Sequence, residues 1–338
     1  MNAPELVLVA ATRGWCAGVE RAVEMVERTL ERYGPPIYVR KQIVHNRHVV
    51  ESFTRRGVVF VDDEREAPPG AHIVFSAHGV SPEVHRRAAA RGLQAVDAVC
   101  PLVTKVHREA RRFADAGYDV VLIGHAGHEE VEGTMGEAPG AITLVETVEE
   151  VDRLEVRDPR RVAWISQTTL AVDEAAQIVG RLVARFPDVV GPRSEDICYA
   201  TTNRQQAVKE LAERCDLVLV IGSVNSSNSN RLVETSLAQG TPARLVDGSA
   251  DVEDDWLDGV EVVGITAGAS AAEELVQELI AFFVARGTCR IEDLRVEPER
   301  IHFALPRTLA LATAPARGAT RVPPARGAPP ASGARPQG

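Results

Sequence analysis

A pattern that occurs three times along the chain limits what it can fold into. Each time, a cysteine stands at or just before the predicted start of a helix, which is marked by apolar residues at helical spacing. The three segments cover residues 13–34, 97–117 and 196–215. Their cysteines are Cys16, Cys100 and Cys198. Pattern rather than identity carries the similarity, and it predicts three copies of one structural unit.

Two polar loops follow each cysteine, and each loop comes at the end of an apolar run. The first loops come at a nearly constant spacing from the cysteines and contain His45, His128 and Ser226. The second loops come further along each unit, at a more variable spacing, and contain His78, Thr168 and Ser270. Ligands of α/β sheets bind outside the carboxyl ends of the strands. If the three units converge there, three thiols meet at a centre and the polar loops surround it.

Short apolar runs alternate with helical patterns along the body of the chain, which is typical of parallel α/β layers. Seven of these runs are expected to be strands: residues 5–10, 36–40, 72–77, 119–124, 162–166, 216–222 and 260–266. We predict an α/β fold of three pseudo-symmetric units, each with a mainly parallel sheet, around a central cavity. The expected units are residues 1–97, 98–193 and 194–304.

Net charge, the composition of the C-terminal end and the lengths of the apolar runs indicate which partners and which compartment to expect. The net charge is -10, which does not favour nucleic acid as a partner. Residues 305–338 are rich in Ala, Pro, Arg and Gly and have no periodicity, so we expect a disordered tail. No apolar run reaches the length of a membrane span, and no signal peptide is recognisable. We therefore expect a cytoplasmic protein that does not bind membranes.

The five cysteines are an odd number, which argues against a disulfide framework in a long chain of this kind. A helix N-terminus lowers the pKa of a thiol and favours the thiolate that binds metal. Three separated thiolates suit either zinc with an open fourth position or an iron–sulfur cluster. The alternative is that they are buried as small hydrophobic side chains. For Cys215 and Cys289, that structural interpretation is the better one.

The polar loops offer mostly neutral hydrogen-bond donors near predicted helix starts, as in sites that hold phosphate. These residues are His45, His78, His128, Ser226, Ser227, Asn228 and Ser270. Helix capping is an alternative explanation, since Ser and Asn are preferred N-caps and Ser270 with Glu273 resembles a capping box. Capping and ligand contact are compatible at one residue.

Glu130 is a candidate proton donor, because it lies two residues after His128 in a segment bounded by glycines. Its neighbours Glu129 and Glu132 are expected to be surface acids. Thr168 lies in the second polar loop of the middle unit.

Nine motifs in order carry a resemblance to a known family: RGWCAGVERAV, VHN, SAHGVS, CPLVTKVH, GHAGHEEVEGTMG, QTTL, DICYATTNRQ, GSVNSSNSNRL and TAGASA. Over residues 6–303 the chain resembles the 4-hydroxy-3-methylbut-2-enyl diphosphate reductase, or LytB, family. The resemblance implies three α/β domains around a cavity that holds a four-iron, four-sulfur (4Fe-4S) cluster. It also implies the last step of the non-mevalonate isoprenoid pathway, which forms isopentenyl and dimethylallyl diphosphate by reductive dehydroxylation.

The resemblance assigns roles to residues of this chain. The cluster ligands would be Cys16, Cys100 and Cys198. The diphosphate pocket would comprise His45, His78, His128, Ser226, Ser227, Asn228 and Ser270. Glu130 would supply protons, aided by His128 and by Thr168 beside the substrate hydroxyl. The electron donor would be a ferredoxin or a flavodoxin.

Two positions depart from the family pattern: Trp15 stands where Phe is usual, and Glu129 where Pro is common. Trp15 is expected to change packing near the cluster, and Glu129 to loosen the loop or add a charge. Two other functions remain open. One is a three-cysteine cluster dehydratase similar to quinolinate synthase, which needs an arginine-rich dicarboxylate pocket. The other is a non-enzymatic cluster or zinc sensor, which needs no acid such as Glu130.

Overall fold

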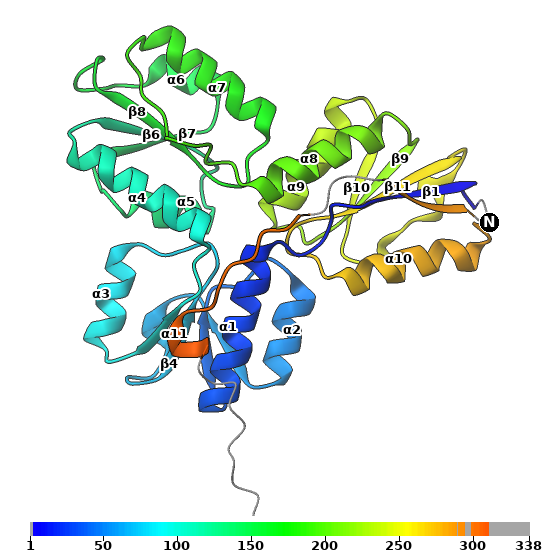
Figure 1. The fold of residues 1–338 in the computed structure, drawn as a ribbon, viewed down its shortest axis with the longest axis horizontal. Coiled ribbons are helices and arrows are strands. Elements are labelled where there is room, and N and C mark those ends of the chain that lie inside the picture. Colours follow the sequence, from blue (N-terminus) through cyan, green and yellow to red (C-terminus); the bar gives the residue numbers. More distant parts are fainter. Residues whose placement is uncertain (1–2, 289, 295–298, 311–338) are drawn as a thin grey trace, which may run out of the picture.

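Three parallel sheets, each with its helices, form three lobes around a common centre (Figure 1). The computed structural model describes residues 3–288, 290–294 and 299–310. The predicted α/β fold with three mainly parallel sheets is confirmed, and each strand pair within the sheets is parallel. Within the described residues, no helix combines the length and apolar character that crossing a bilayer requires.

The first lobe contains a four-stranded sheet in the order β3-β2-β4-β5. Its strands are β2 (Ile37–Arg40), β3 (Val58–Val61), β4 (His72–Phe75) and β5 (Gln94–Asp97). Its helices are α1 (Ala17–Tyr33), α2 (Arg47–Arg55), α3 (Pro82–Ala90) and the short 3-10 helix η1 (Glu64–Glu66). The two central strands were predicted from the sequence, and the two edge strands were not.

The second lobe contains the smallest sheet, in the order β7-β6-β8. Its strands are β6 (Asp119–Ile123), β7 (Ile142–Val145) and β8 (Val162–Ser166). Its helices are α4 (Pro101–Asp115), α5 (Glu129–Met135), α6 (Val148–Arg153) and α7 (Val172–Arg185). Strand β6, in the middle, is buried from Val120 to Ile123, as expected for a strand covered on both faces.

The third lobe contains a five-stranded sheet in the order β10-β9-β11-β1-β12. Its strands are β1 (Leu6–Ala10), β9 (Leu217–Ile221), β10 (Ala243–Val246), β11 (Val262–Ala267) and β12 (Arg290–Leu294). Its helices are α8 (Tyr199–Ala212), α9 (Ser227–Ala238), α10 (Glu273–Arg286) and the 3-10 helices η2 (Ser249–Asp251) and η3 (Asp254–Leu257).

Strand β1 lies in a different lobe from the one that its sequence position indicates. A first unit of residues 1–97 places it beside β2–β5, whereas it pairs with β11 and β12 in the third sheet. Its residues Val7 to Ala10 are at most 1% exposed. A strand so apolar on both faces is stable only between two neighbours, and the third sheet provides that position.

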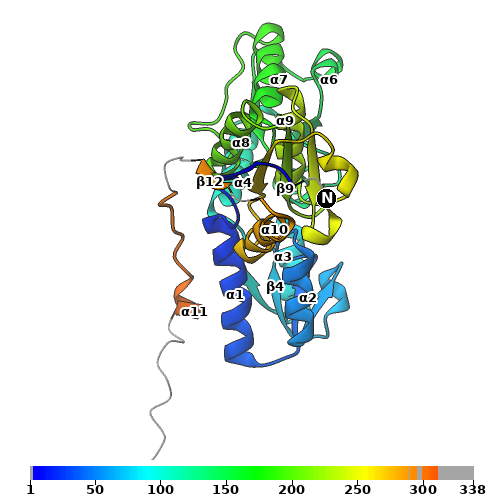
Figure 2. The ribbon, with the colours of Figure 1, turned by 90° about the vertical axis from the view of Figure 1, so that its right-hand side faces the viewer.

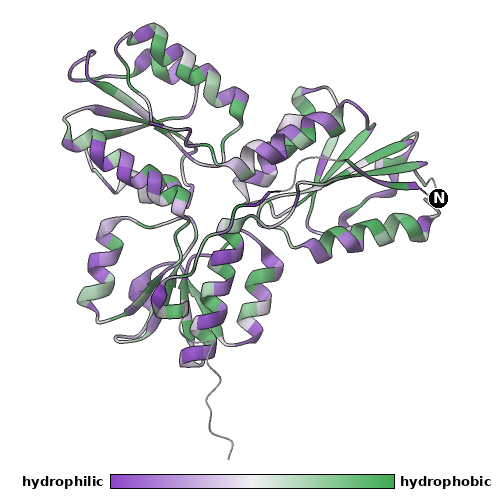
Figure 3. Cartoon of the chain, viewed as in Figure 1, coloured by the Kyte–Doolittle hydropathy of each residue, from purple (hydrophilic) through white to green (hydrophobic). Residues whose placement is uncertain are grey.

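The core of each lobe lies between its sheet and the apolar faces of its helices. Figure 3 shows hydrophobic strands and helices that are hydrophobic on one side and hydrophilic on the other. In α1 the buried residues recur at helical spacing, from Val19 through Val23 and Val26 to Leu30, and they pack with the first sheet. The helices therefore hold their N-terminal ends, where the cysteines stand, in fixed positions.

The segment that follows the third lobe returns to the first lobe and packs there. It runs along α1 and ends in the short helix α11 (Arg307–Ala310), drawn in orange in Figures 1 and 2. Leu309 is 2% exposed in the first core, and Leu305 packs against the same core. The expectation of a disordered tail from residue 305 is thus wrong for residues 305–310, because these two leucines bury apolar surface. Residues 311–338 lie outside the described part of the chain.

Candidate active site

The three cysteines occupy equivalent positions, each as the N-cap of a long helix: α1, α4 and α8. None of the three side chains caps its helix, so the sulfur atoms are not engaged in that role. The backbone N–H of each cysteine donates, at 2.9–3.1 Å, to a carbonyl oxygen in one of the second polar loops. The acceptor is Ala269 for Cys16, Ala77 for Cys100 and Thr168 for Cys198. Each cysteine turn is therefore held by a loop of another lobe: the first by the third lobe, the second by the first, and the third by the second.

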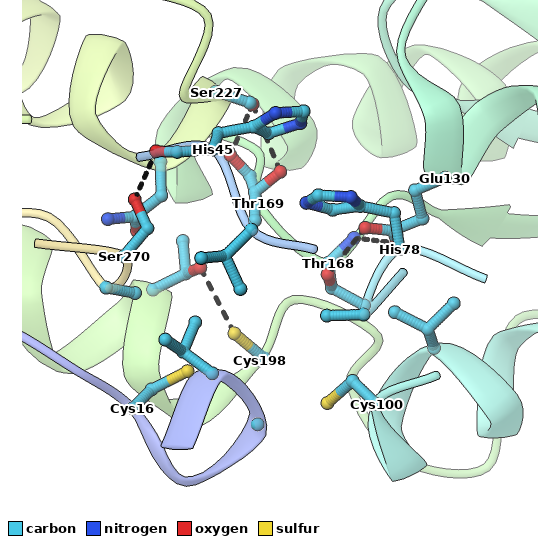
Figure 4. Close-up of a pocket in the computed structure, with 18 of the residues that line it drawn as sticks. Cys16, His45, His78, Cys100, Glu130, Thr168, Thr169, Cys198, Ser227 and Ser270 are labelled. Carbon is cyan, nitrogen blue, oxygen red and sulfur yellow. Dashed lines mark hydrogen bonds between the residues drawn. The ribbon is translucent and has the colours of Figure 1, made fainter. Parts of the chain in front are cut away.

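Gly18 makes room for two of the sulfur atoms. A Cβ at this position would lie 2.8 Å from the Sγ of Cys100 and 3.7 Å from the Sγ of Cys16, so both sulfurs border the space that the missing side chain leaves. The third sulfur, that of Cys198, lies 3.1 Å from the Thr201 hydroxyl. Figure 4 shows the three thiols gathered on one side of a cavity. They are free cysteines, not disulfide-bonded.

The pKa values of Cys100 and Cys198 differ from the expectation that helix N-termini lower the pKa of a thiol. Burial raises the pKa of Cys100 to about 12 and that of Cys198 to about 11, and the neighbouring sulfur of Cys16 adds to both increases. Desolvation outweighs the backbone N–H groups because the cavity is largely apolar on this side. Thiolates in such a place need a positive partner, and a soft metal centre provides it. The residues therefore fit a metal cluster held by sulfur.

The cavity has the thiols at one end and polar side chains at the other (Figure 4). It encloses about 670 Å³ of empty space, including the part that opens to solvent. All twelve predicted site residues line it: Cys16, His45, His78, Cys100, His128, Glu130, Thr168, Cys198, Ser226, Ser227, Asn228 and Ser270. The structure thus brings together residues from all three lobes; their individual roles remain predictions.

Three imidazoles form a cluster at the polar end. His45 stacks on His78 with ring centroids 4.1 Å apart, and His128 meets both rings edge-on, at 5.6 Å and 5.7 Å. Burial, reinforced by neighbouring imidazoles, lowers the pKa of His45 to about 2 and that of His128 to about 3. Both rings are therefore neutral near pH 7 while the cavity holds no anion.

Glu130 is fully enclosed and makes a double contact with one residue. Its Oε1 accepts from the Thr168 backbone N–H at 2.7 Å, and its Oε2 accepts from the Thr168 hydroxyl at 2.8 Å. Burial raises the pKa of Glu130, although both hydrogen bonds oppose the increase. The Nδ1 of His128 accepts from the Glu130 backbone N–H at 3.1 Å, so the proton of the neutral ring lies on Nε2.

Glu129 is not the surface acid that the sequence suggests. Its side chain is 15% exposed, and its Oε2 lies 3.3 Å from Nδ1 of His78 and 3.2 Å from the Ser76 hydroxyl. Burial raises the pKa of Glu129, but the hydrogen bonds from His78 and Ser76 and the charge of His78 outweigh burial and leave it below its usual value. The extra carboxylate orients a cavity histidine and links the first lobe to the second. Glu132 is exposed, as predicted.

The loop before α9 combines capping with side chains that face the cavity. Ser226 accepts from the Ser229 backbone N–H at 3.3 Å and so caps the helix. Asn228 is 4% exposed, and neither atom of its side-chain amide has a partner in the structure. A buried amide without partners is costly unless a ligand satisfies it. Asn228 therefore places two unpaired polar atoms at the wall of the cavity.

Ser270 does not form the capping box with Glu273 that the sequence suggests. The N-cap of α10 is Ala272, and it has no side-chain hydrogen bond. The Ser270 hydroxyl instead donates to the His45 carbonyl oxygen at 2.9 Å, while the Asn46 side chain donates to the Ser270 carbonyl oxygen at 2.8 Å. These two bonds join the first lobe to the third at the rim of the cavity.

Nine residues of the described cavity wall lie outside the predicted set of twelve, and Gly18, Thr169 and Thr201 are among them. Gly18 and Thr201 lie in the first turn of helices that begin directly after cysteines. Their positions two and three residues past a cysteine are the signal that identifies them, since a helix returns side chains of its first turn to the same end. Thr169 contacts Ser227 at 3.0 Å and joins the second lobe to the third.

A comparison with protein families identifies the family to which this chain belongs. A model described as "LytB protein" matches residues 7–283. The chain is 57% identical over 304 residues to a 4-hydroxy-3-methylbut-2-enyl diphosphate reductase of Leifsonia xyli, with 90% of each chain covered. This chain belongs to the LytB family. A reductase with the same name from Nocardia farcinica is 58% identical over 304 residues, again with 90% of each chain covered.

Solved structures of LytB proteins share the fold. The structure of the E-1-hydroxy-2-methyl-but-2-enyl-4-diphosphate reductase from Plasmodium falciparum matches with a TM-score of 0.86 and 37% identity, over 92% of this chain and 98% of that one. A structure of (E)-4-hydroxy-3-methyl-but-2-enyl diphosphate reductase matches with a TM-score of 0.59 and 30% identity, over 83% and 99%. This LytB chain is therefore comparable in length to its relatives.

Proposed function

We propose that this LytB protein reduces (E)-4-hydroxy-3-methylbut-2-enyl diphosphate to isopentenyl and dimethylallyl diphosphate, the last step of the non-mevalonate pathway. The reaction takes up two electrons and two protons, replaces the hydroxyl group by hydrogen and releases water. The observation that carries the proposal is one cavity with three thiols at one end and neutral anion-binding donors at the other. The names of the relatives supply the substrate.

Cys16, Cys100 and Cys198 would hold a 4Fe-4S cluster. When bound, such a cluster supplies electrons one at a time and a Lewis-acidic iron without a protein ligand. Three cysteines for four irons suit that chemistry, and the space beside Gly18 admits the two sulfurs that border it. Hydrophobic residues such as Val19 and Val103 line the same end and exclude water from it.

The other end of the cavity would bind the diphosphate. Its lining includes no lysine or arginine among the described residues, so the anion would be held by neutral donors. The Asn228 side-chain amide has unused donors, and the proton of neutral His128 is available on Nε2. The N-terminal end of α9, with Ser226 and Ser227, adds backbone N–H groups and a favourable dipole.

Glu130 would be the proton donor. Burial raises the pKa of Glu130, so this carboxyl group keeps its proton to a higher pH than a solvated glutamate does. The Thr168 hydroxyl is 2.8 Å from Oε2 and fixes the orientation of the group. His128 adjoins Glu130 through the backbone and would help to deliver protons. Which end of the allyl unit receives the proton determines which of the two products forms.

Two further parts of the proposal concern the surroundings of the protein. A one-electron carrier, either a ferredoxin or a flavodoxin, would supply the electrons. The cytoplasm would be the compartment, because thiols stay reduced there and the described cysteines are free.

The structure favours the reductase over the two alternative functions. A dicarboxylate-binding dehydratase needs cationic side chains in its pocket, and the described cavity lining has none. A sensor needs no enclosed acid, whereas Glu130 is only 2% exposed and faces the cavity. Family membership points to the reductase as well.

The test is an anaerobic turnover assay on protein reconstituted with iron and sulfide, using the allylic diphosphate with dithionite and a redox dye. Formation of both products supports the proposal, and a cluster-loaded protein that does not turn over the substrate contradicts it. Cys→Ser at 16, 100 or 198 should remove the visible absorbance of the cluster. Cys215→Ser is the control, since Cys215 lies in the third core, away from the cavity.

A further inference from the structure

The chain segment Glu299–Leu305, which we call the strap, crosses from the third lobe to the first. Figures 1 and 2 show it running past the N-terminal end of α1 and then along this helix toward α11. Each end of the strap meets an arginine of the body. Those two arginines also bind backbone carbonyl groups next to the three cysteines.

At the first end of the strap, Glu299 pairs with the buried Arg204 of α8. Arg204 is 1% exposed, and its Nη1 lies 3.0 Å from Oε1 of Glu299. The same guanidinium donates to the carbonyl oxygens of Gly14 at 2.7 Å and of Ala200 at 2.9 Å. Gly14 stands two residues before Cys16, and Ala200 two residues after Cys198. One side chain therefore joins two cysteine turns and the strap.

At the other end, Arg21 of α1 contacts Ala304. Its Nε donates to the Ala304 carbonyl oxygen at 3.2 Å. Its Nη1 donates to the carbonyl oxygens of Val99 at 3.0 Å and of Ala98 at 3.4 Å, directly before Cys100. Since α1 begins directly after Cys16, Arg21 fixes the turn of Cys100 relative to the helix that carries Cys16.

The strap is what stabilises this arrangement. A buried guanidinium without a carboxylate partner is strongly destabilising, and Glu299 is the carboxylate that pairs with Arg204 in the described structure. Removing the strap thus leaves Arg204 as a buried unpaired cation and Arg21 with one acceptor fewer. The planar guanidinium group of each arginine is then no longer held in the orientation in which it donates to two chain segments at once.

We propose that the strap sets the separation of the three cysteine turns, with Arg204 and Arg21 as positioning residues for the metal site. This rests on the proposed role of the three cysteines as cluster ligands. Residues that orient metal ligands typically contribute about 10- to 100-fold to metal affinity, so we expect about tenfold faster loss of iron to a chelator when a contact of the strap is broken.

The test uses Arg204→Lys, Glu299→Gln and Arg21→Lys in the full chain. Lysine keeps the charge but lacks the planar fork whose separate nitrogens reach acceptors on different chain segments. Arg185→Lys is the matched control, because Arg185 also joins two backbone carbonyls, those of Val151 and Leu154, within the second lobe. Iron release to a chelator is measured after anaerobic reconstitution, and thermal unfolding of the metal-free proteins shows whether the variants are equally stable.

A second measurement needs no metal. A short bifunctional thiol reagent links Cys16 to Cys198 in metal-free protein that carries Cys100→Ser, Cys215→Ala and Cys289→Ser. We expect Arg204→Lys and Glu299→Gln to lower the yield of this link, while Arg185→Lys leaves it unchanged. Arg21→Lys is tested on a different pair, Cys16 with Cys100. The protein used for this pair carries Cys198→Ser and keeps Cys100.

The two measurements distinguish this proposal from the proposed function. If the wild-type protein takes up no iron, the proposed function is wrong. The cross-linking yields then still show whether the strap sets the separation of the cysteine turns. If the strap variants release iron and form links as the Arg185→Lys control does, the strap only packs against the body and the proposal is wrong. If Arg204→Lys does not fold, the Arg21→Lys variant decides, because Arg21 is only half-buried and its effect is measured on the link between Cys16 and Cys100.

Discussion

Replacing Glu130 by glutamine tests the proton donor without disturbing its surroundings. The amide oxygen can still accept from the Thr168 backbone N–H, and the amide nitrogen can donate to the Thr168 hydroxyl, which accepts as readily as it donates. Both contacts therefore survive, and the cavity keeps its shape. What the variant loses is an acidic proton in an enclosed site.

The expected loss follows from that single change. A positioned general acid contributes about 10²- to 10⁴-fold to a rate, which corresponds to roughly 3–5 kcal/mol of the activation free energy. We expect Glu130→Gln to lose turnover by this factor, to keep iron and sulfide at wild-type levels, and to bind inorganic pyrophosphate as tightly as the wild type. The assay is anaerobic turnover with dithionite and a redox dye, with iron content and calorimetric titration of pyrophosphate alongside.

Stability supplies an independent check. Burial raises the pKa of Glu130 from its ordinary value of 4.5, so the folded protein binds this proton more tightly than the unfolded chain. The stabilisation from Glu130 is complete below pH 4.5 and is lost as pH rises through the folded-state pKa. Metal-free Glu130→Gln should therefore gain stability relative to the wild type as pH rises above 4.5, as measured by denaturant unfolding.

The neighbouring Glu132→Gln is the control, because Glu132 belongs to the same helix but is exposed. It should leave turnover unchanged. Turnover of Glu130→Gln at the wild-type rate would refute the assignment of the proton donor. Loss of iron from Glu130→Gln would show instead that this residue supports the metal site.

Three further changes have distinct expected outcomes. Gly18→Ala places a Cβ 2.8 Å from the Cys100 sulfur, so iron per chain should fall, although the helix gains about 1 kcal/mol in propensity. Asn228→Ala removes two unpartnered buried atoms, so the metal-free protein should gain roughly 1 kcal/mol of stability while its calorimetric affinity for pyrophosphate falls. Burial lowers the pKa of His128 to about 3, so this group costs stability as pH falls from 6.5 toward 3; unfolding of His128→Asn should depend less on pH across that range.

The sequence predicted the strands in proportion to their burial. The strands inside the sheets, such as β2, β6 and β9, are continuous apolar runs, and each was recognised. Among the edge strands, β8 was recognised, since four of its five residues are buried, whereas β3, β5, β7, β10 and β12 were not. An edge strand is covered less and tolerates polar residues, as β12 shows with four of its five residues exposed. Its apolar pattern is therefore too weak to separate it from a loop.

The residues of the cavity were predictable where three lobes repeat one pattern. The cysteines and the loops behind them recur at similar spacing, and this periodicity alone indicated their convergence. Glu129 and Arg204 have no counterpart of that kind. Their partners, His78 and Glu299, lie 51 and 95 residues away along the chain, and contacts of this sort depend on how lobes dock. Nothing local in the sequence marks them.

The position of β1 also shows where local reasoning ends. Its composition predicts a buried strand, and the structure confirms one. Composition does not say which sheet buries it, because any parallel sheet with a place between two strands satisfies the same apolar residues. The choice depends on the whole chain, since β1 pairs with β11 and β12, which come from the far end of the folded body.

That pairing has a consequence for how the molecule is made. The third sheet takes β1 from the beginning of the chain and β12 from near the end of the body, so it cannot close until residue 294 has been synthesised. Until β11 and then β12 have been synthesised, a strand of four almost inaccessible apolar residues lacks one or both of its neighbours, which is the situation in which nascent chains aggregate. Cys16 follows β1 closely in the sequence, so the first of the three proposed cluster ligands is fixed in place only when the third sheet is complete.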